Sequence, residues 1–187
     1  MNDFERDNEW QRRMRDNILA PLFYVRYSLD GRYVFIDKGR LASTLQKRFA
    51  VDTIAQSKSG DAVCIEEKIV RWPTFPNGKP KDRGYTAFAL ETQSCTVPGR
   101  ESDGWMVYGK ADYLLYCFAN LEQTALICYL VDFPKLQAWF WEREHEFPPF
   151  QMLDTINRTR GRVVPIADVC EAVPVKSWLL ETEADAA

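Results

Sequence analysis

The sequence predicts an α/β protein: a single domain in which a mixed β-sheet is flanked by helices. β-like and helical segments alternate along the 187 residues, which is typical of a sheet whose neighbouring strands are joined by helical crossovers. The 46% hydrophobic content is enough for a buried core, and no repeat or linker divides the chain. We therefore expect one domain over residues 1–180 and a disordered tail over 181–187.

The N-terminal quarter predicts a helix, a hairpin and a second short helix. Residues 4–19 carry apolar side chains near helical spacing, and Pro21 is expected to end this first helix. Residues 22–37 contain two β-rich runs around the turn sequence LDGR, which is a hairpin signal. Residues 39–49 have leucines at i and i+4 and suit a short helix.

Three neighbouring strands are expected next. The runs 50–56 and 62–72 are β-like and are joined by SKSGD, which is a further hairpin signal. A polar loop rich in proline and glycine covers 74–84, and 85–94 reads as the third strand. Residues 97–104 predict a second loop, so that two loops are expected to flank one end of these strands.

The remaining segments complete the α/β pattern. Residues 110–120 have apolar side chains at i, i+3, i+4 and i+7 and predict a helix, whereas 125–132 predicts a central apolar strand. Residues 134–147 predict a helix with Pro134 in its first turn. The C-terminal segments are expected to be a helix near 150–158, a strand at 162–166 and a helix at 166–173.

Composition excludes several classes of function. The net charge of −3 offers no generally basic surface, and the charged N-terminus and the absence of a long apolar run predict a cytoplasmic protein without a membrane segment. The five cysteines are scattered in apolar surroundings and read as buried reduced thiols. With His145 as the single histidine, zinc sites and Ser-His or Cys-His nucleophile systems are poorly supported. Carboxylates and lysines must therefore carry any catalysis.

The stretch GDAVCIEEKIVRW, residues 60–72, places charges inside an apolar strand. Side chains alternate between the faces of a strand, so Glu66 and Lys68 share one face and Glu67 points away. The hairpin folds Asp52, at the start of the preceding strand, back toward Glu66. Two carboxylates meeting at one end of a sheet suit a hard divalent cation, and a lysine beside them could orient the attacking water or stabilise a phosphate.

This arrangement resembles the PD-(D/E)XK nuclease superfamily, which has the restriction-endonuclease-like fold. The resemblance is carried by Asp52, the hairpin and the triplet Glu66-Glu67-Lys68 read as Glu-x-Lys, within a similar order of elements over roughly residues 4–142. Glu67 departs from the pattern, because the middle residue is commonly apolar in this superfamily. Asp52 also lacks the preceding proline.

The resemblance implies a metal-dependent endonuclease that hydrolyses phosphodiester bonds in nucleic acid, DNA foremost. Asp52, Glu66 and Lys68 are then the catalytic residues, with Asp52 and Glu66 holding Mg²⁺ or Mn²⁺. Small nucleases of this kind often act as homodimers, because each subunit cuts one strand. Phosphate contacts are expected from the basic loop and from the next predicted helix, through Lys79, Lys81, Arg83 and Lys110.

Further acidic residues could join the site. Glu91, on the strand that follows Lys68, could be a third metal-binding carboxylate, although a solvated strand position is the alternative. Glu5 or Glu9 could reach the site from the first helix. Lys110 and Asp112 are expected at a helix start, where a phosphate contact and ordinary helix capping are both open.

A second class of function stays open. A Glu/Lys pair across neighbouring strands is also ordinary sheet surface. The chain could then be a non-catalytic module that keeps the nuclease-like fold and binds nucleic acid or a protein, for example in phage defence. Loss of Asp52, Glu66 or Lys68 would favour this alternative, and all three are present.

Overall fold

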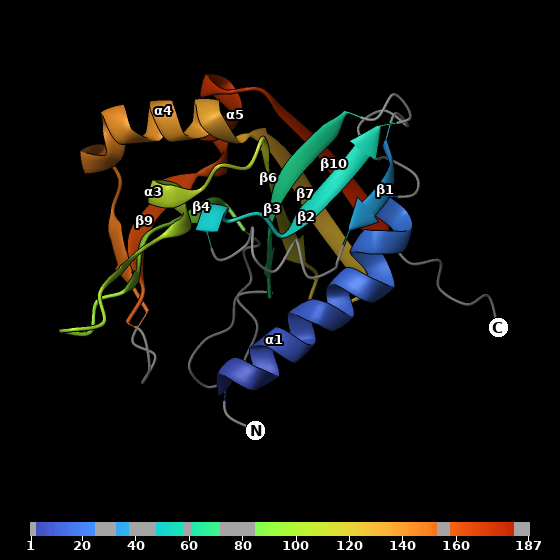
Figure 1. Ribbon diagram of the computed structural model, residues 1–187, viewed down its shortest axis with the longest axis horizontal. Coiled ribbons are helices and arrows are strands. Elements are labelled where there is room, and N and C mark those ends of the chain that lie inside the picture. Colours follow the sequence, from blue (N-terminus) through green and yellow to red (C-terminus); the bar gives the residue numbers. More distant parts are fainter. Residues whose placement is uncertain are drawn as a thin grey trace.

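The computed structural model describes residues 3–24, 33–37, 48–57, 61–71, 85–152 and 158–181. These residues form a mixed α/β structure of two β-sheets and flanking helices (Figure 1). The mixed α/β class predicted from the sequence is therefore confirmed. No helix among the described residues is long and apolar enough to cross a membrane.

The first sheet has six strands within the described residues, in the order β1-β2-β3-β6-β7-β10. Neighbouring strands run antiparallel except β3 and β6, which are parallel. The sheet is therefore mixed, as expected. Its strands are β1 (Tyr33–Asp37), β2 (Thr53–Ser57), β3 (Ala62–Val70), β6 (Tyr113–Ala119), β7 (Ala125–Asp132) and β10 (Val175–Glu181).

The second sheet is antiparallel and supplies the connection between β3 and β6. Its strands lie in the order β5-β4-β9-β8. Because β3 and β6 are parallel, the chain must cross over between them, and it does so through β4, β5 and the short helix α3 rather than through one long helix. The bounds are β4 (Ala87–Cys95), β5 (Ser102–Asp103), α3 (Trp105–Tyr108), β8 (Pro149–Gln151) and β9 (Arg160–Pro165).

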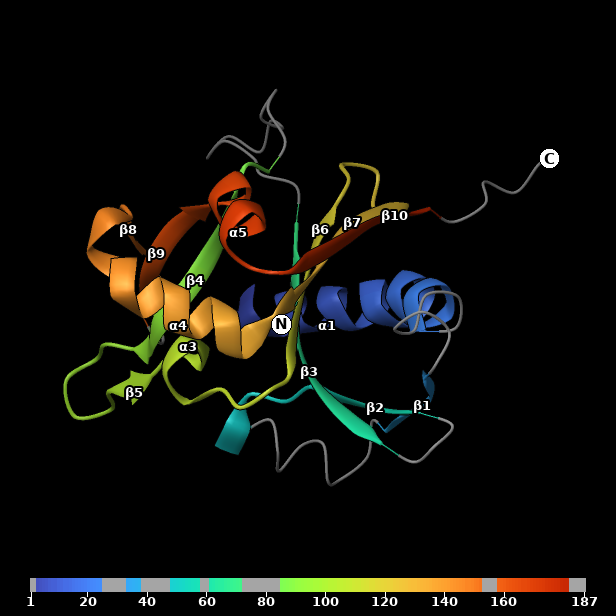
Figure 2. The same ribbon diagram turned by 90° about the horizontal axis from the view of Figure 1, so that it is seen from above.

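Helices cover both faces of the first sheet (Figures 1 and 2). One apolar cluster joins one face of this sheet to α1 and the π-helix η1. A second cluster joins the other face to the second sheet, α4 and α5. The central strands β3 and β6 are therefore buried on both faces. The helical segments are α1 (Asp3–Met14), η1 (Arg15–Tyr24), α4 (Phe133–Arg143), η2 (Glu144–Glu146) and α5 (Ile166–Ala172).

The expected helix over 110–120 is wrong, because Tyr113–Ala119 forms the strand β6. Leu114 through Ala119 are all buried, three toward each core cluster. A strand buried on both faces carries an unbroken apolar run without alternation. In an unbroken apolar run the positions i, i+3, i+4 and i+7 are always apolar. The helical spacing seen in the sequence therefore could not distinguish a helix from a buried strand.

The expectation that Pro21 ends the first helix is also wrong. The α-helix changes to the π-helix η1 at Arg15, and η1 runs through Pro21 to Tyr24. In an α-helix the Pro21 ring would meet the carbonyl of Asn17, whereas the wider turn of a π-helix changes which carbonyl faces the ring.

The other expected elements have mixed outcomes. Strands at 50–56, 62–72, 85–94, 125–132 and 162–166 are confirmed with shifted ends, as are the helices beginning near Pro134 and Ile166. The helix near 150–158 is wrong at its start, where β8 forms, and the loop 97–104 contains the two-residue β5. Of the predicted hairpin 22–37, the second strand exists as β1, and residues 22–24 are helical. The predictions for 25–32, 38–47, the turn at 58–60, 72–84, 153–157 and 182–187 lie outside the described residues.

Candidate active site

The strand β3 places its charged side chains on opposite faces of the first sheet. Cys64 packs against the cluster on the side of the second sheet, whereas Ile65 and Ile69 pack toward α1. By alternation, Glu66 and Lys68 face the second sheet and Glu67 faces α1. The strand thus separates two adjacent glutamates into two different environments.

Glu66 and Lys68 form an ion pair on the side of the second sheet. The Lys68 Nζ lies 2.6 Å from Glu66 Oε1. The Glu66 side chain is only 3% exposed and that of Lys68 is 34% exposed. Glu66 Oε2 is buried and accepts no hydrogen bond from another group among the described residues, although the Asp52 carboxyl lies within hydrogen-bond reach of Glu66. A buried acceptor without a partner is costly, so this oxygen is a natural position for a proton or a cation.

Asp52 lies beside Glu66 because the pairing of β2 with β3 brings it there. The backbone N–H of Asp52 donates to the carbonyl of Ile65 at 2.9 Å. The backbone N–H of Glu67 donates to Asp52 Oδ2 at 3.0 Å. These two bonds attach Asp52 to β3 immediately before β2 begins. The structure therefore brings Asp52, Glu66 and Lys68 together.

The charges of this group shift the pKa values of its members. Burial raises the pKa of Glu66 to about 8, against the opposing effect of Lys68, and the nearby Asp52 carboxylate raises it further. Burial lowers the pKa of Lys68, but the charge of Glu66 and the smaller contributions of Asp52 and Glu91 outweigh burial and raise the pKa above its ordinary value. Lys68 is therefore an ammonium at neutral pH, and Glu66 easily carries a proton.

The second sheet contributes Glu91, and the adjoining helix α3 contributes two aromatic residues that the sequence did not single out. Glu91 lies on β4, is half-buried and accepts a hydrogen bond from Ser94 Oγ. The ring centroid of Trp105 lies 5.3 Å from Lys68 Nζ. Burial, followed by the charge of Glu66, raises the pKa of Tyr108, which places this phenol within the electrostatic reach of the site.

Gly104 makes this close packing possible. A Cβ at Gly104 would lie 2.4 Å from the carbonyl oxygen of Glu91, so no other residue fits without moving β4. The Gly104 N–H instead donates to the Thr92 carbonyl at 2.9 Å. The sequence GW at 104–105 was the available signal for this contact between α3 and β4.

A cleft of about 450 Å³ opens beside Lys68 and Glu91. Its volume lies within the range of small-molecule and substrate sites. The walls come from β3, β4, α1, α3, β6 and the segment around β8, and they include Trp10, Ala89, Trp105, Tyr116, Phe150 and Met152. Lys68 and Glu91 are thus accessible from a single concave surface, whereas Asp52 and Glu66 do not line it.

A second cavity, of about 660 Å³, adjoins this cleft because Trp10 and Arg71 line both. The Arg71 guanidinium lies over the Trp10 ring, 4.6 Å from its centroid. Arg12 and Arg13 of α1 also line this cavity, which we call the arginine groove. Its remaining lining residues are Glu9, Asp16, Asn17 and Gln123.

The carboxylates fit a hard divalent cation in number and kind. Mg²⁺ is usually bound by one or two carboxylates together with water and substrate phosphates. Asp52 and Glu66 are two such carboxylates, and Glu66 Oε2 is a buried oxygen without a hydrogen-bond partner among the described residues. Three or more acidic, histidine or cysteine side chains in a metal-holding arrangement do not occur within the described residues.

Lys110 and Asp112 do not lie at a helix start, contrary to expectation. They precede the strand β6, so the reason for expecting a phosphate contact at a helix N-terminus is lost. Both side chains are exposed. Asp112 Oδ2 accepts a hydrogen bond from the Cys64 N–H at 2.7 Å, which attaches the start of β6 to β3. Asp112 therefore has a structural contact. For Lys110, only its positive charge still supports a phosphate contact.

The other candidates are separate from the acidic group or cannot be placed. Lys79, Lys81 and Arg83, and the side chain of Glu5, lie outside the described residues. Glu9 is exposed and lines the arginine groove. Of the cysteines, Cys95, Cys117 and Cys128 are buried as expected, whereas Cys64 is half-buried and Cys170 is exposed.

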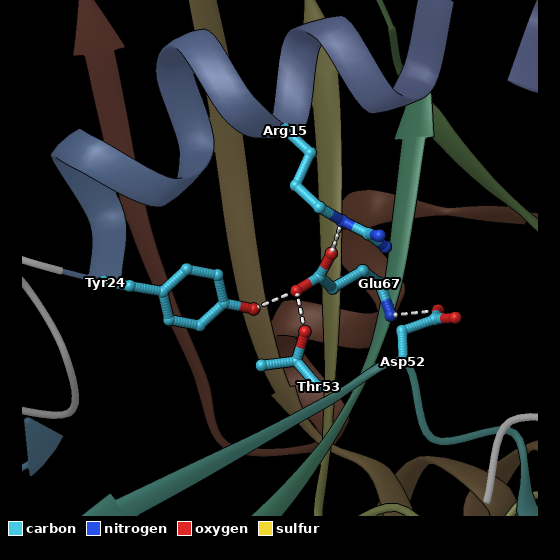
Figure 3. A network of polar contacts seen from close by, with 5 residues as sticks. All are labelled: Arg15, Tyr24, Asp52, Thr53 and Glu67. Atoms are coloured by element: carbon cyan, nitrogen blue, oxygen red, sulfur yellow. Dashed lines mark hydrogen bonds and ion pairs between the residues drawn. The ribbon is translucent and has the colours of Figure 1, made fainter. Parts of the chain in front are cut away.

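Glu67 is a polar residue whose partners the sequence did not reveal. Its side chain is buried on the α1 side and is contacted by Arg15, Tyr24 and Thr53 (Figure 3). The available signal was the presence of a second glutamate within a buried strand, because a buried carboxylate requires partners. The Arg15 partner is 52 residues away in the sequence, so local spacing could not identify it.

Comparison with known proteins finds no matching family model, curated protein or solved structure. The function must therefore be argued from the geometry of the site.

Proposed function

We propose that the protein is a cytoplasmic, metal-dependent nuclease that hydrolyses phosphodiester bonds in nucleic acid, DNA foremost. The observation that carries the proposal is the buried Glu66 carboxylate. One of its oxygens is paired with Lys68, and the other has no hydrogen-bond partner among the described residues, with Asp52 close by. An exposed Glu/Lys pair on an ordinary sheet surface would keep both carboxylate oxygens in water, whereas here Lys68 contacts only one of two buried oxygens.

Each residue has a distinct role in this proposal. Asp52 and Glu66 would hold Mg²⁺ or Mn²⁺, with Glu91 as a further acidic residue at the edge of the cleft. When bound, such an ion supplies Lewis acidity to water and to phosphate oxygens. Lys68, which stays protonated, would donate a hydrogen bond to the attacking water or to a phosphate oxygen as negative charge develops there.

The proposed reaction is balanced by water alone. The water oxygen forms a bond to phosphorus while the bond from phosphorus to one sugar oxygen breaks. One proton of the water is released and the leaving oxygen takes up a proton, so that the products are a phosphate monoester and an alcohol. No oxidant, reductant or group donor is needed.

The surroundings of the site also support a polynucleotide substrate. The arginine groove continues from the cleft, and guanidinium groups bind phosphates through paired hydrogen bonds. A restriction-endonuclease-like fold is part of the proposal: the strands that carry Asp52 and Glu66 are adjacent and antiparallel, and β3 has a parallel neighbour, β6. Contacts from Lys79, Lys81 and Arg83, and a homodimer that cuts both strands, complete it.

Cleavage of labelled nucleic acids tests the proposal. Duplex, single-stranded and branched DNA and RNA are incubated with the protein and Mg²⁺ or Mn²⁺, with EDTA as the control. Cleavage that requires the metal and is lost in Lys68→Ala supports the proposal. The matched control is Lys176→Ala, which changes an exposed lysine on β10. If no substrate is cleaved under any condition and Mn²⁺ does not bind, the nuclease proposal is overturned.

The non-catalytic alternative has a different outcome in the same experiment. A binding module would retain nucleic acid or a protein partner equally well with metal and with EDTA. Lys68→Ala would then leave every measured activity unchanged. The two classes of function are therefore separated by one set of titrations.

A further inference from the structure

The buried carboxylate of Glu67 is held by three donors from two separate elements, the π-helix η1 and the strand β2 (Figure 3). Arg15, at the start of η1, donates to Oε2 from its Nε. Tyr24, at the end of η1, donates to Oε1 from its hydroxyl. Thr53 Oγ1, on β2, donates to the same oxygen at 2.5 Å. The Glu67 side chain is only 1% exposed, and both of its carboxyl oxygens have hydrogen-bond donors.

The same residue holds Asp52 through its backbone. The Glu67 N–H donates to Asp52 Oδ2, and Thr53, which follows Asp52 in the chain, donates to the Glu67 side chain. Glu67 therefore contacts two consecutive residues, one through its peptide group and one through its carboxylate. Figure 3 shows Asp52 and Thr53 on either side of Glu67, with Arg15 and Tyr24 approaching from the helix.

Asp52 needs such an anchor for two reasons. It lies before β2 begins, and the chain enters this point through Ala50 at a φ of +50°, an uncommon conformation for a residue other than glycine. Its carboxylate also lies beside that of Glu66, and two neighbouring carboxylates repel each other. Without a fixed donor, the Asp52 side chain would turn away from Glu66.

We propose that Glu67 is a positioning residue: its carboxylate, clamped by Arg15, Tyr24 and Thr53, fixes the Asp52 carboxylate beside Glu66. This inference rests on the proposed function, because a fixed Asp52 carboxylate matters only if Asp52 binds a cation. It goes further by assigning a role to the π-helix η1, whose Arg15 and Tyr24 contact Glu67. Arg15 and Tyr24 hold the Glu67 side chain, and the Glu67 peptide N–H in turn holds Asp52.

The variant Thr53→Val tests the clamp with little change in shape. It removes one donor to Glu67 and keeps the β-branched side chain that suits a strand. Hydrogen exchange of the Glu67 amide reports directly on its bond to Asp52, and a Mn²⁺ titration reports on the cation site. In Thr53→Val we expect faster exchange of this amide and about tenfold weaker Mn²⁺ binding, the scale typical for loss of a partner behind a metal ligand.

Two control variants separate positioning from general stability. Thr53→Ser keeps the hydroxyl and should retain both the slow exchange and the Mn²⁺ affinity of the wild type. Leu126→Ala removes a buried side chain from the same core cluster without touching Glu67, so it should lower the thermal stability and leave Mn²⁺ affinity unchanged.

The outcomes are distinct. Unchanged exchange of the Glu67 amide in Thr53→Val overturns the clamp. Faster exchange with unchanged Mn²⁺ affinity shows that the clamp is only structural and overturns the positioning role. If the wild type itself binds no Mn²⁺, the proposed function fails, and the exchange measurement alone still decides whether Glu67 fixes Asp52.

Discussion

The charge state of Glu66 makes a prediction about folding stability that needs no substrate. The folded state raises the pKa of Glu66 from 4.5 to about 8. Between these values the folded chain holds a proton that the unfolded chain has released, so the free energy of unfolding falls as the pH rises. The slope is about 1.4 kcal/mol per pH unit, and the loss reaches about 5 kcal/mol at most.

The variant Glu66→Gln removes this titration. Glutamine is close in shape to the protonated glutamic acid and cannot ionise. The folded wild type carries a neutral, protonated Glu66 over most of this range, so the change to glutamine leaves the charge beside Lys68 nearly the same there. The free energy of unfolding of Glu66→Gln, relative to wild type, should therefore rise by about 1.4 kcal/mol for each unit between pH 5 and pH 8.

Urea unfolding in EDTA, followed by tryptophan fluorescence at pH 5, 6, 7 and 8, measures this difference. The matched control is Glu101→Gln, which changes an exposed glutamate and should follow the wild-type profile. Parallel profiles for wild type and Glu66→Gln would refute the reasoning, because they would show that Glu66 has an ordinary pKa and is not buried beside Asp52.

Three other predictions follow from the same geometry. Lys68→Ala should abolish cleavage and leave Mn²⁺ affinity within about threefold of wild type, because the lysine acts on the transition state; an equal loss of affinity would contradict this role. Mn²⁺ affinity, measured by calorimetry, should rise up to tenfold per pH unit from pH 6 to 8 and level off above, since the Glu66 proton must leave first; a flat profile would exclude Glu66 as a ligand. The double change Arg12→Ala and Arg13→Ala should weaken binding of a labelled oligonucleotide and flatten its salt dependence, by up to about one unit of log–log slope per lost phosphate contact; an unchanged slope would place the substrate elsewhere.

Local patterns in the sequence determined the strands of the site and the orientation of its side chains. The turn SKSGD between two β-like runs predicts the pairing of β2 with β3 that places Asp52 against the Glu66 strand. Alternation along 62–70 predicts that Glu66 and Lys68 share a face and that Glu67 does not. Both inferences depend on neighbours within about fifteen residues, and at that range backbone geometry leaves few alternatives.

Long-range packing decided the rest. Residues 113–119 form a strand because η1 covers one face of β6 while the second sheet covers the other, and an apolar run alone does not record how many of its faces are covered. The second sheet, which brings Glu91 to Lys68 and carries the helix α3 with Trp105 and Tyr108 beside it, is built by pairing β4 with β9 across about 70 residues of chain. The sequence contains these residues but not their proximity.

Glu67 shows most clearly which properties come from the local sequence and which come from the tertiary structure. Its type and its place in an apolar strand indicate that it must find partners if it is buried. Arg15 and Tyr24 become those partners only when the helix that carries them packs against the sheet, 52 and 43 residues away along the chain. The sequence by itself determined which local faces the charged side chains occupy. Only the tertiary structure decided which charges meet, because burial and pairing depend on surfaces brought together from distant segments.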